Sequence, residues 1–207
     1  MRRVSVADVE VALRGWARPP HRDGSGPERI QAAVCLPLRD TADGVAVWCI
    51  RRPDRMRHHS REMAFPGGKP DPGDADLVAT ALRETEEELG VPRADLRVIG
   101  KLAAVPTATS LFTLNPVVAA VAPGVEARPA PDEVDELVSF PLEGFFSGEL
   151  RYQAVDLGRY YSPIFHFDAG AMYGATAHVL LELFSLYAAV AGLELPKPEL
   201  TTTVPWA

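Results

Sequence analysis

The chain is poor in cysteine: its only two, Cys35 and Cys49, stand alone within apolar segments typical of strands. A zinc site or a disulfide framework needs more cysteines, so we expect both to be small core residues without a chemical role. The sequence also lacks an apolar run close to the roughly 18 residues that span a bilayer. Its first residues, MRRVSVADVEVALRGW, contain polar residues throughout rather than the continuous apolar stretch of a secretory signal. We therefore expect a cytoplasmic location.

Basic residues are outnumbered, with 21 Lys and Arg against 28 Asp and Glu, for a net charge of -7. Nonspecific binding to nucleic acid rests largely on neutralisation of phosphates by Lys and Arg, so a long duplex is not an expected partner. The 207 residues are 47% hydrophobic, which is ample for a single buried core. We expect a catalytic domain over residues 28–195, after an N-terminal helix and Pro/Gly-rich connector (1–27) and before a C-terminal tail (196–207).

Hydrophobic patterning predicts a chain of mixed α/β class, in the order strands, helix, strands, helix. A turn at Asp43 and Gly44 separates the first two strands, and a Pro/Thr/Ser-rich loop before residue 114 lies between two later ones. Helices are expected over residues 4–16 and 173–193, and strands over residues 30–38, 45–51, 96–105, 114–121, 133–140 and 160–167.

The most informative stretch is FPGGKPDPGDADLVATALRETEEELGV, residues 65–91, in which a diglycine turn precedes a helical segment. Residues three and four apart on a helix lie on the same side, so Glu84, Glu87 and Glu88 are predicted to converge. A second, mostly apolar stripe is predicted roughly opposite them and would pack against the core. That stripe consists of Val78, Leu82, Thr85 and Leu89.

Both ends of this helix carry sequence signals. Asp74 is the predicted N-cap, because an aspartate side chain accepts hydrogen bonds from the first free backbone N–H groups. Gly90 follows Leu89 at the position where a left-handed residue commonly ends a helix, since glycine has no Cβ to clash. The sequence therefore predicts a helix that begins after Asp74 and ends at Leu89.

Three carboxylates on one side of a helix repel one another, and a bound cation is the physical reason to tolerate them. Carboxylate oxygens suit Mg²⁺ or Mn²⁺, and no Cys or His cluster nearby favours zinc. The alternative is a solvated acidic face, as most charged runs are. The diglycine turn directly upstream favours the metal site, because it lets a phosphate-sized ligand approach the backbone.

The segment Arg83-Glu84-Thr85-Glu86-Glu87-Glu88-Leu89-Gly90-Val91 resembles the second half of the Nudix box, RE-U-x-EE-x-G-U, where U is aliphatic. Thr85 departs from the aliphatic position. Gly68 stands one residue further before Arg83 than in the usual box, and Asp74 replaces the customary intermediate glutamate. This longer box, with FPGG and the DPGDA run, resembles the coenzyme A pyrophosphatase branch of the Nudix superfamily.

Two further segments are similar to that branch. Its upstream pattern, LLTxRSxxxRxxxGxxxFPGG, is matched at Arg52, Arg57 and FPGG, whereas Pro53 stands for serine and Arg61 for glycine. Residues 172–177, MYGATA, resemble the WGxTA segment of the branch. The two departures concern the substrate more than the chemistry.

The resemblance implies a Nudix α/β/α sandwich around a mixed β-sheet. It also implies divalent-metal-dependent hydrolysis, in which water attacks one phosphorus of a nucleoside diphosphate derivative. The expected substrate is coenzyme A or acyl-CoA, giving 3′,5′-ADP and (acyl)phosphopantetheine. Glu84, Glu87 and Glu88 are the implied metal ligands, and Arg83 is the implied catalytic residue that orients them, rather than an ordinary surface ion-pair partner. Related folds often form homodimers, so a homodimer is expected here.

Substrate contacts are expected on the approach to the box. Gly67 and Gly68 permit close backbone approach, although a generic turn would look the same. Arginine suits bidentate phosphate recognition, but an ordinary basic loop is the alternative. The candidate phosphate-binding residues are Arg52, Arg57, Arg61 and Lys69.

Two questions stay open at this level. The general base is either a box glutamate or a carboxylate from a distant loop, with Glu133 and Glu136 as outside candidates. The substrate alternatives are ADP-ribose, a dinucleotide or another nucleotide. A different class of protein, a catalytically silent Nudix-like regulatory module, need not retain all the chelating carboxylates that this chain keeps.

Overall fold

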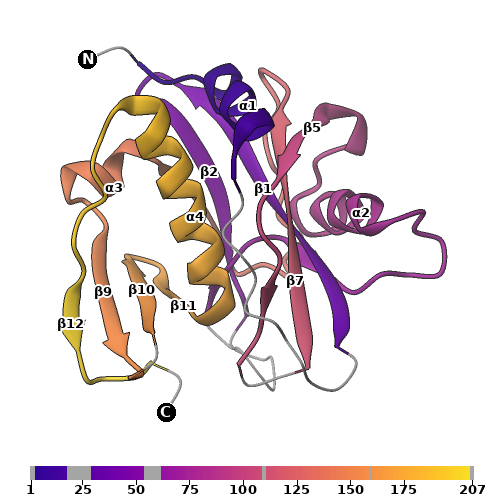
Figure 1. The fold of residues 1–207 in the computed structure, drawn as a ribbon. Helices are drawn as coiled ribbons and strands as arrows, with labels where there is room; N and C mark the ends of the chain where they lie inside the picture. The colour runs from indigo at the N-terminus through magenta and orange to yellow at the C-terminus, as the bar shows by residue number, and fades with distance from the viewer. Residues whose placement is uncertain (1–2, 18–28, 54–61, 109–110, 159, 206–207) are drawn as a thin grey trace.

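A computed structural model describes residues 3–17, 29–53, 62–108, 111–158 and 160–205 of the chain (Figure 1). The predicted connector at 17–27 lies almost wholly outside these ranges, as do Arg57 and Arg61. The described residues form two β-sheets with helices packed on them.

The larger sheet is mixed and has the strand order β3-β2-β1-β7-β5. Three more strands join it: β4 pairs with β1, β6 with β7 and β8 with β2. β1 and β7 run parallel, and the other pairs are antiparallel. Its strands are β1 (Ile30–Thr41), β2 (Gly44–Arg51), β3 (Met63–Ala64), β4 (Gly67–Gly68), β5 (Leu96–Lys101), β6 (Val105–Pro106), β7 (Phe112–Val121) and β8 (Glu136–Pro141).

The predicted hairpin at the start of the domain is confirmed. β1 and β2 pair antiparallel from Leu38 opposite Val47 to Thr41 opposite Gly44. Gly44 has φ +116°, a left-handed conformation that glycine adopts at no steric cost, which is why the chain turns there.

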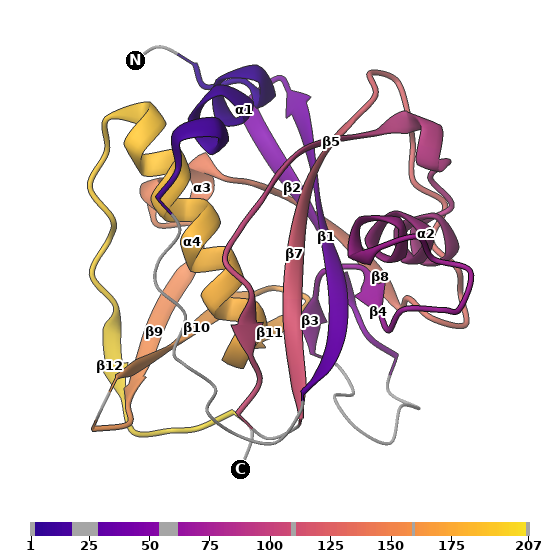
Figure 2. The same cartoon turned by 45° about the vertical axis from the view of Figure 1, so that its right-hand side comes forward.

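Helices cover both faces of this sheet, as Figures 1 and 2 show, and they divide the core in two. Side chains alternate along a strand, so Val34 and Leu36 of β1 pack on one side while Ala33 and Cys35 pack on the other. The first side holds α1 (Val6–Gly15) and α4 (Gly174–Ala191), and the second holds α2 (Leu77–Leu89). The predicted α/β/α sandwich around a mixed sheet is confirmed.

A second, four-stranded sheet lies beside α4, in the order β11-β10-β9-β12 (Figure 1). It consists of β9 (Arg151–Asp156), β10 (Tyr161–Phe167), β11 (Gly170–Tyr173) and β12 (Glu199–Thr201), and α3 (Glu143–Ser147) precedes it. Only β10 was among the predicted strands. β11 and β12 are too short to show a periodic pattern, and β12 forms within the segment expected to be a tail, by parallel pairing with β9.

The predicted strand over 96–105 is wrong as one element, because the chain divides it into β5 and β6. The pairing of β5 with β7 shifts register between Val98 and Gly100, and beyond β5 the amide of Leu102 donates to the carbonyl of Pro116 at 3.1 Å. The pairing of this segment with β7 is therefore interrupted, although the hydrophobic pattern of the sequence continues through it. The strand expected to begin at residue 133 begins at Glu136, after a turn.

Helix α4 confirms the predicted C-terminal helix and corrects one expectation about apolar segments. Its 18 residues have a mean hydropathy of 1.4, so by length and composition alone it passes as a membrane span. Half of that window is buried inside the protein, as in the core helix of a globular fold.

A buried carboxylate in α4 ties the N-terminal helix to the domain. Glu182 is 7% exposed and accepts hydrogen bonds from the Ala103 amide at 3.0 and 3.2 Å. It also accepts one from Trp16 Nε1, just after α1, at 3.1 Å. The helix predicted over 4–16 is thus present as α1 and is held against the core.

Both cysteines are core residues, as predicted: Cys35 and Cys49 are fully buried and unpaired. Burial in an apolar environment raises the pKa of the Cys35 thiol to about 12 and that of Cys49 still further. Neither thiol is therefore a nucleophile at neutral pH.

Candidate active site

Helix α2 begins two residues later than predicted. Asp76, rather than Asp74, is its N-cap, and the Asp76 carboxylate accepts from the Ala79 amide at 2.8 Å. Asp74 belongs instead to a tight turn, in which its amide donates to the Asp71 carbonyl and its carboxylate accepts from the Asp71 amide, both at 2.9 Å. The predicted C-terminus is confirmed, because Gly90 is left-handed with φ +63°.

The division of α2 into a packing face and a chelating face is less sharp than predicted. Thr85 and Leu89 are buried as expected, but Val78 and Leu82 are only partly buried. Glu88 is 7% exposed and so lies on the packed side of the helix. One of the three predicted metal ligands is therefore a largely desolvated carboxylate.

The diglycine turn is built into the sheet beside α2. Gly67 and Gly68 form β4 and pair with Val34 and Ala33 of β1. A Cβ on Gly67 would overlap the Ala33 carbonyl oxygen and lie 2.7 Å from Val34 Cα. Only glycine fits there, since a real Cβ essentially never comes within 3.0 Å of such atoms.

Gly68 brings the turn against the first glutamate of the helix. A Cβ on Gly68 would overlap the Glu84 carboxylate and lie 2.5 Å from its Cδ. The Glu84 carboxylate thus occupies the space that a side chain at residue 68 would fill. This contact places a helix carboxylate directly against the backbone of the diglycine turn.

Glu88 reaches the same turn from one helical turn further on. Its Oε2 accepts a hydrogen bond from the Gly67 amide at 3.0 Å. Burial raises the pKa of Glu88 to about 8, although the Arg52 charge and the Gly67 hydrogen bond oppose that rise. The charges of Glu84 and Glu133 raise it further.

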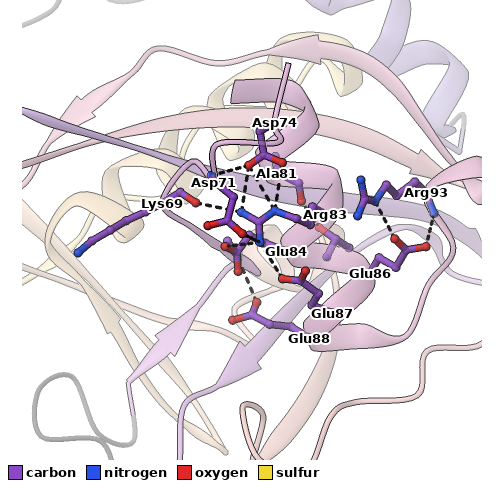
Figure 3. Close-up of polar contacts among 12 residues, drawn as sticks. Lys69, Asp71, Asp74, Ala81, Arg83, Glu84, Glu86, Glu87, Glu88 and Arg93 are labelled. Carbon is purple, nitrogen blue, oxygen red and sulfur yellow. Dashed lines mark hydrogen bonds and ion pairs between the residues drawn. The ribbon is translucent and has the colours of Figure 1, made fainter. Parts of the chain in front are cut away.

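Arg83 is the hub of the cluster (Figure 3). Its guanidinium is bonded to Glu87 Oε2 at 2.7 Å and Glu84 Oε1 at 3.0 Å. It also donates to Asp74 through Nε at 3.1 Å and to the Lys69 carbonyl at 3.0 Å. With a side chain only 11% exposed, Arg83 is not a surface ion-pair partner.

Charge in the cluster is unevenly compensated. The two-point contact with Arg83 lowers the pKa of Asp74 well below its usual range, aided by the Asp71 amide. Burial raises the pKa of Glu84, against the opposing effect of Arg83, and the charges of Glu87 and Glu133 add to the rise. Burial therefore disfavours the charged form of both carboxylates where Glu84 and Glu88 meet the turn.

Comparison with known proteins decides the family. A model of the NUDIX domain matches residues 29–161, which is 133 of the 207 residues and more than half of the chain. The chain belongs to the Nudix family. The matched region includes the larger sheet, α2 and every residue of the site described above.

Relatives agree with this assignment. A protein named uncharacterized Nudix hydrolase NudL from Citrobacter koseri is 36% identical over 143 residues, covering 69% of this chain and 68% of the relative. The protein of the same name from Yersinia enterocolitica is 39% identical over 130 residues, covering 63% of this chain and 61% of the relative. The chain thus spans less than two thirds of the Yersinia protein.

Solved structures share the fold. The Nudix hydrolase RenU from M. smegmatis superposes with a TM-score of 0.52 at 19% identity, over 82% of this chain and 90% of RenU. An Ap4A hydrolase from C. elegans superposes with a TM-score of 0.51 at 16% identity, over 79% of this chain and 99% of that enzyme. The predicted Nudix fold is thereby confirmed.

The Nudix box accounts for the residues that the structure brings together. Glu84 and Glu88 meet at Gly67 and Gly68, whereas Glu87 is joined to them through Arg83 and its side chain is 48% exposed. Within the described ranges, no three Asp, Glu, His or Cys side chains are gathered closely enough to hold a metal ion as they stand. The metal-binding role of the three glutamates stays a prediction.

The donor chemistry nevertheless fits Mg²⁺ or Mn²⁺, which prefer carboxylate oxygens. Glu84 and Glu88 supply two partly desolvated carboxylates at the turn. Glu87 is held by Arg83 at the surface end of the cluster, with its side chain 48% exposed. The Gly67 and Gly68 backbone closes the other side.

Of the predicted phosphate-binding residues, Arg52 and Lys69 lie within the described ranges. Arg52 follows β2, and its charge acts on Glu88. Lys69 faces away from the glutamates (Figure 3), with its Nζ 5.1 Å from the centre of the Phe112 ring. Both roles stay predictions, as do those of Arg57 and Arg61 outside the described residues.

The structure separates the two outside candidates for the base. Glu133 lies close enough to act electrostatically on Glu84 and Glu88, and its turn is tied to α2 by the Ala130 amide, which donates to the Glu88 carbonyl at 2.9 Å. Glu136 instead pairs with Arg51 at 3.3 Å. Of the two, only Glu133 is close enough to the box for its charge to act on Glu84 and Glu88.

Sequence reasoning missed one contact at the site. The Tyr173 hydroxyl, at the end of β11, donates to the Glu62 carboxylate, just ahead of β3 and FPGG. The two residues are 111 positions apart, so periodicity carries no sign of the pairing. The similarity of residues 172–177 to the WGxTA segment was the only available signal.

Proposed function

We propose that this Nudix protein is a divalent-metal-dependent pyrophosphohydrolase acting on a nucleoside diphosphate derivative, with coenzyme A or acyl-CoA as the preferred substrate. The products are 3′,5′-ADP and (acyl)phosphopantetheine. One observation carries the proposal: two partly desolvated carboxylates of the box helix, Glu84 and Glu88, meet a diglycine turn that leaves no room for a side chain.

The residues of the cluster divide the work among them. When bound, Mg²⁺ or Mn²⁺ supplies neutralisation of the phosphate oxygens and makes water more acidic. Glu84, Glu87 and Glu88 hold the cation, and Arg83 orients Glu84 and Glu87 through hydrogen bonds of 3.0 and 2.7 Å. The diglycine turn binds the diphosphate by close backbone approach.

Glu133 is the better outside candidate for the general base. Its position close to Glu84 and Glu88 lets it accept a proton from water near the scissile phosphorus, whereas Glu136 is committed to Arg51. A box glutamate remains the alternative. Glu133→Gln separates the two, because loss of a base lowers kcat with little change in KM.

The coenzyme A assignment rests on two motif segments. The FPGG approach and the MYGATA segment both resemble the coenzyme A pyrophosphatase branch, and the Tyr173–Glu62 contact brings the two together in space. Pro53 and Arg61 depart from the pattern and keep ADP-ribose, a dinucleotide or another nucleotide as the second candidate. A silent regulatory module is disfavoured because all three chelating glutamates are retained.

A substrate panel tests the proposal. Coenzyme A, acetyl-CoA, ADP-ribose and a dinucleoside polyphosphate are incubated with Mg²⁺ or Mn²⁺ in ¹⁸O water, and product masses report the substrate and the attacked phosphorus together. We expect metal-dependent turnover of coenzyme A that is abolished by EDTA. Rapid turnover of ADP-ribose with none of coenzyme A would reject the preferred substrate, and no turnover of any compound would favour the silent module.

Substitutions test the residues. Glu84→Gln, Glu87→Gln and Glu88→Gln are each expected to lower kcat/KM by at least about a hundredfold, as loss of a directly acting group does. Glu86→Gln is the matched control, because Glu86 lies on the same helix but pairs with Arg93 at 2.7 Å on the surface. Wild-type activity in Glu87→Gln would contradict the metal assignment. Arg57→Ala is expected to raise KM if Arg57 binds substrate.

Assembly and location follow the family expectation. We propose a homodimer in the cytoplasm, with no nucleic-acid or membrane partner. Sedimentation of the purified protein tests the dimer, since a single species at monomer mass over a wide concentration range would contradict it.

A further inference from the structure

The bond between Tyr173 and Glu62 joins parts of the molecule that the Nudix box does not connect. Tyr173 ends β11 of the second sheet and is the residue immediately before α4. Glu62 immediately precedes β3, the edge strand of the larger sheet. The contact therefore fastens the second sheet and α4 to the edge strand that leads into the diglycine turn.

Both partners are held firmly on their own side. Tyr173 pairs with Ile164 in the ladder between β10 and β11. The Glu62 carbonyl accepts from the Arg52 amide at 3.1 Å, which fixes Glu62 against the end of β2. A phenol and a carboxylate, each with its backbone hydrogen-bonded on its own side, form a link with little freedom to shift.

The segment after Glu62 carries this link to the active site. Met63 and Phe65 are buried, at 2% and 1% exposure, so the chain between Glu62 and Pro66 is anchored in the core. The Pro66 carbonyl then accepts from the Cys35 amide at 2.8 Å, and the Gly67 amide donates to Glu88. Four residues thus separate Glu62, the partner of Tyr173, from the Gly67 N–H that holds a box glutamate.

The Arg52 side of the link reaches the same carboxylate. Glu62 holds the Arg52 backbone, and the Arg52 charge acts on Glu88. The geometric route from Glu62 to Glu88 is the backbone that leads to Gly67. A shift of Glu62 would therefore move the Gly67 amide that holds Glu88.

We propose that Tyr173 is a positioning residue of the active site, which acts through Glu62 to hold the diglycine turn and Glu88 in register. This inference rests on the proposed hydrolytic function. It assigns Tyr173 a role in catalysis without contact with the substrate, and it makes the second sheet and α4 part of the catalytic scaffold.

Tyr173→Phe tests the proposal, because it keeps the ring and removes the hydroxyl. A displacement of up to about 1 Å at a catalytic group is expected to lower kcat by about tenfold to a hundredfold and to leave KM within about twofold. Tyr161→Phe is the matched control, since Tyr161 lies on the neighbouring strand β10 and is 54% exposed. Glu62→Ala removes the acceptor and should resemble Tyr173→Phe, and the double variant should be no worse than either, because all three break one link.

Amide hydrogen exchange supplies a readout that does not depend on activity. In Tyr173→Phe, exchange should accelerate in peptides covering residues 62–68 and stay unchanged in peptides from β1 and β7. Wild-type kcat with unchanged exchange would overturn the proposal. Equal acceleration throughout both sheets would also overturn it, because it would show general loosening rather than positioning. If the wild type hydrolyses no compound of the panel, the proposed function fails, and the exchange experiment still decides the structural link.

Discussion

Replacing Gly68 by alanine should damage the active site far more than it damages the fold. The added Cβ would lie 2.5 Å from Glu84 Cδ, whereas ordinary contact begins at 3.4 Å. The Glu84 carboxylate must therefore withdraw by 3.4 minus 2.5, or about 1 Å, and a misplacement of that size at a catalytic group costs roughly a hundredfold in rate. Because the atoms that must move are the end of a flexible side chain, the expected loss in unfolding free energy is only about 1 kcal/mol.

Gly67→Ala provides the contrast. Its Cβ would meet the Ala33 carbonyl oxygen and Val34 Cα, which are backbone atoms of a central strand, at a residue with φ +157°. Neither can move without disturbing the ladder, so we expect a loss of at least about 3 kcal/mol. Gly73→Ala is the control, because nothing lies within 4 Å of its added Cβ, and its stability should change by less than about 0.5 kcal/mol.

The assays are urea unfolding followed by circular dichroism and steady-state hydrolysis with saturating Mn²⁺. The expected pattern is a stable but nearly inactive Gly68→Ala, an unstable Gly67→Ala and an unaffected Gly73→Ala. Full activity in Gly68→Ala would refute the idea that the space beside the turn positions Glu84. Equal destabilisation of the first two variants would refute the distinction between a yielding side chain and an unyielding backbone.

Three further predictions concern the buried groups. Burial raises the pKa of Glu88 from 4.5 to about 8, so its contribution to stability should be present below about pH 4.5 and lost as the pH rises to about 8, on the order of 1.4 kcal/mol per pKa unit. In EDTA, the unfolding free energy of the wild type in urea should fall over this pH range, while that of Glu88→Gln should change less. Parallel curves for the two proteins would contradict this prediction. Glu182→Ala leaves the Ala103 amide and the Trp16 indole without their buried acceptor, so unfolding should weaken by about 2–4 kcal/mol with a red shift in tryptophan emission, whereas Glu182→Gln should lose less. Cys35 and Cys49 should not react with a thiol reagent at pH 8 unless the protein is unfolded, because burial raises both thiol pKa values; rapid labelling of the native protein would show that the core opens.

Much of the fold follows from local pattern. The β1–β2 hairpin, the helices α1, α2 and α4, and the left-handed end of α2 at Gly90 were predicted because each depends on residues within a few positions of one another. The α/β/α arrangement came from resemblance to the Nudix family. Strands of two to four residues, such as β4, β11 and β12, were missed because they exist only through pairing with partners elsewhere in the chain.

The site divides in the same way. Spacing alone placed Glu84 and Glu88 on one helix beside a diglycine turn, because helical geometry and the conformational freedom of glycine are properties of the local chain. Asp74 binds Arg83, nine positions away, instead of capping the helix as predicted. Local sequence rules do not show which of these two interactions the carboxylate makes.

The sequence by itself determined the family, the box and the class of chemistry that its carboxylates suit. Only the tertiary structure decided which distant groups reach the box: Glu133 lies close to it, Glu136 is held by Arg51, and Tyr173 is fastened to Glu62. The reason is that spacing along a helix is set by backbone geometry, whereas contacts across more than a hundred residues exist only once the two sheets and α4 have packed together.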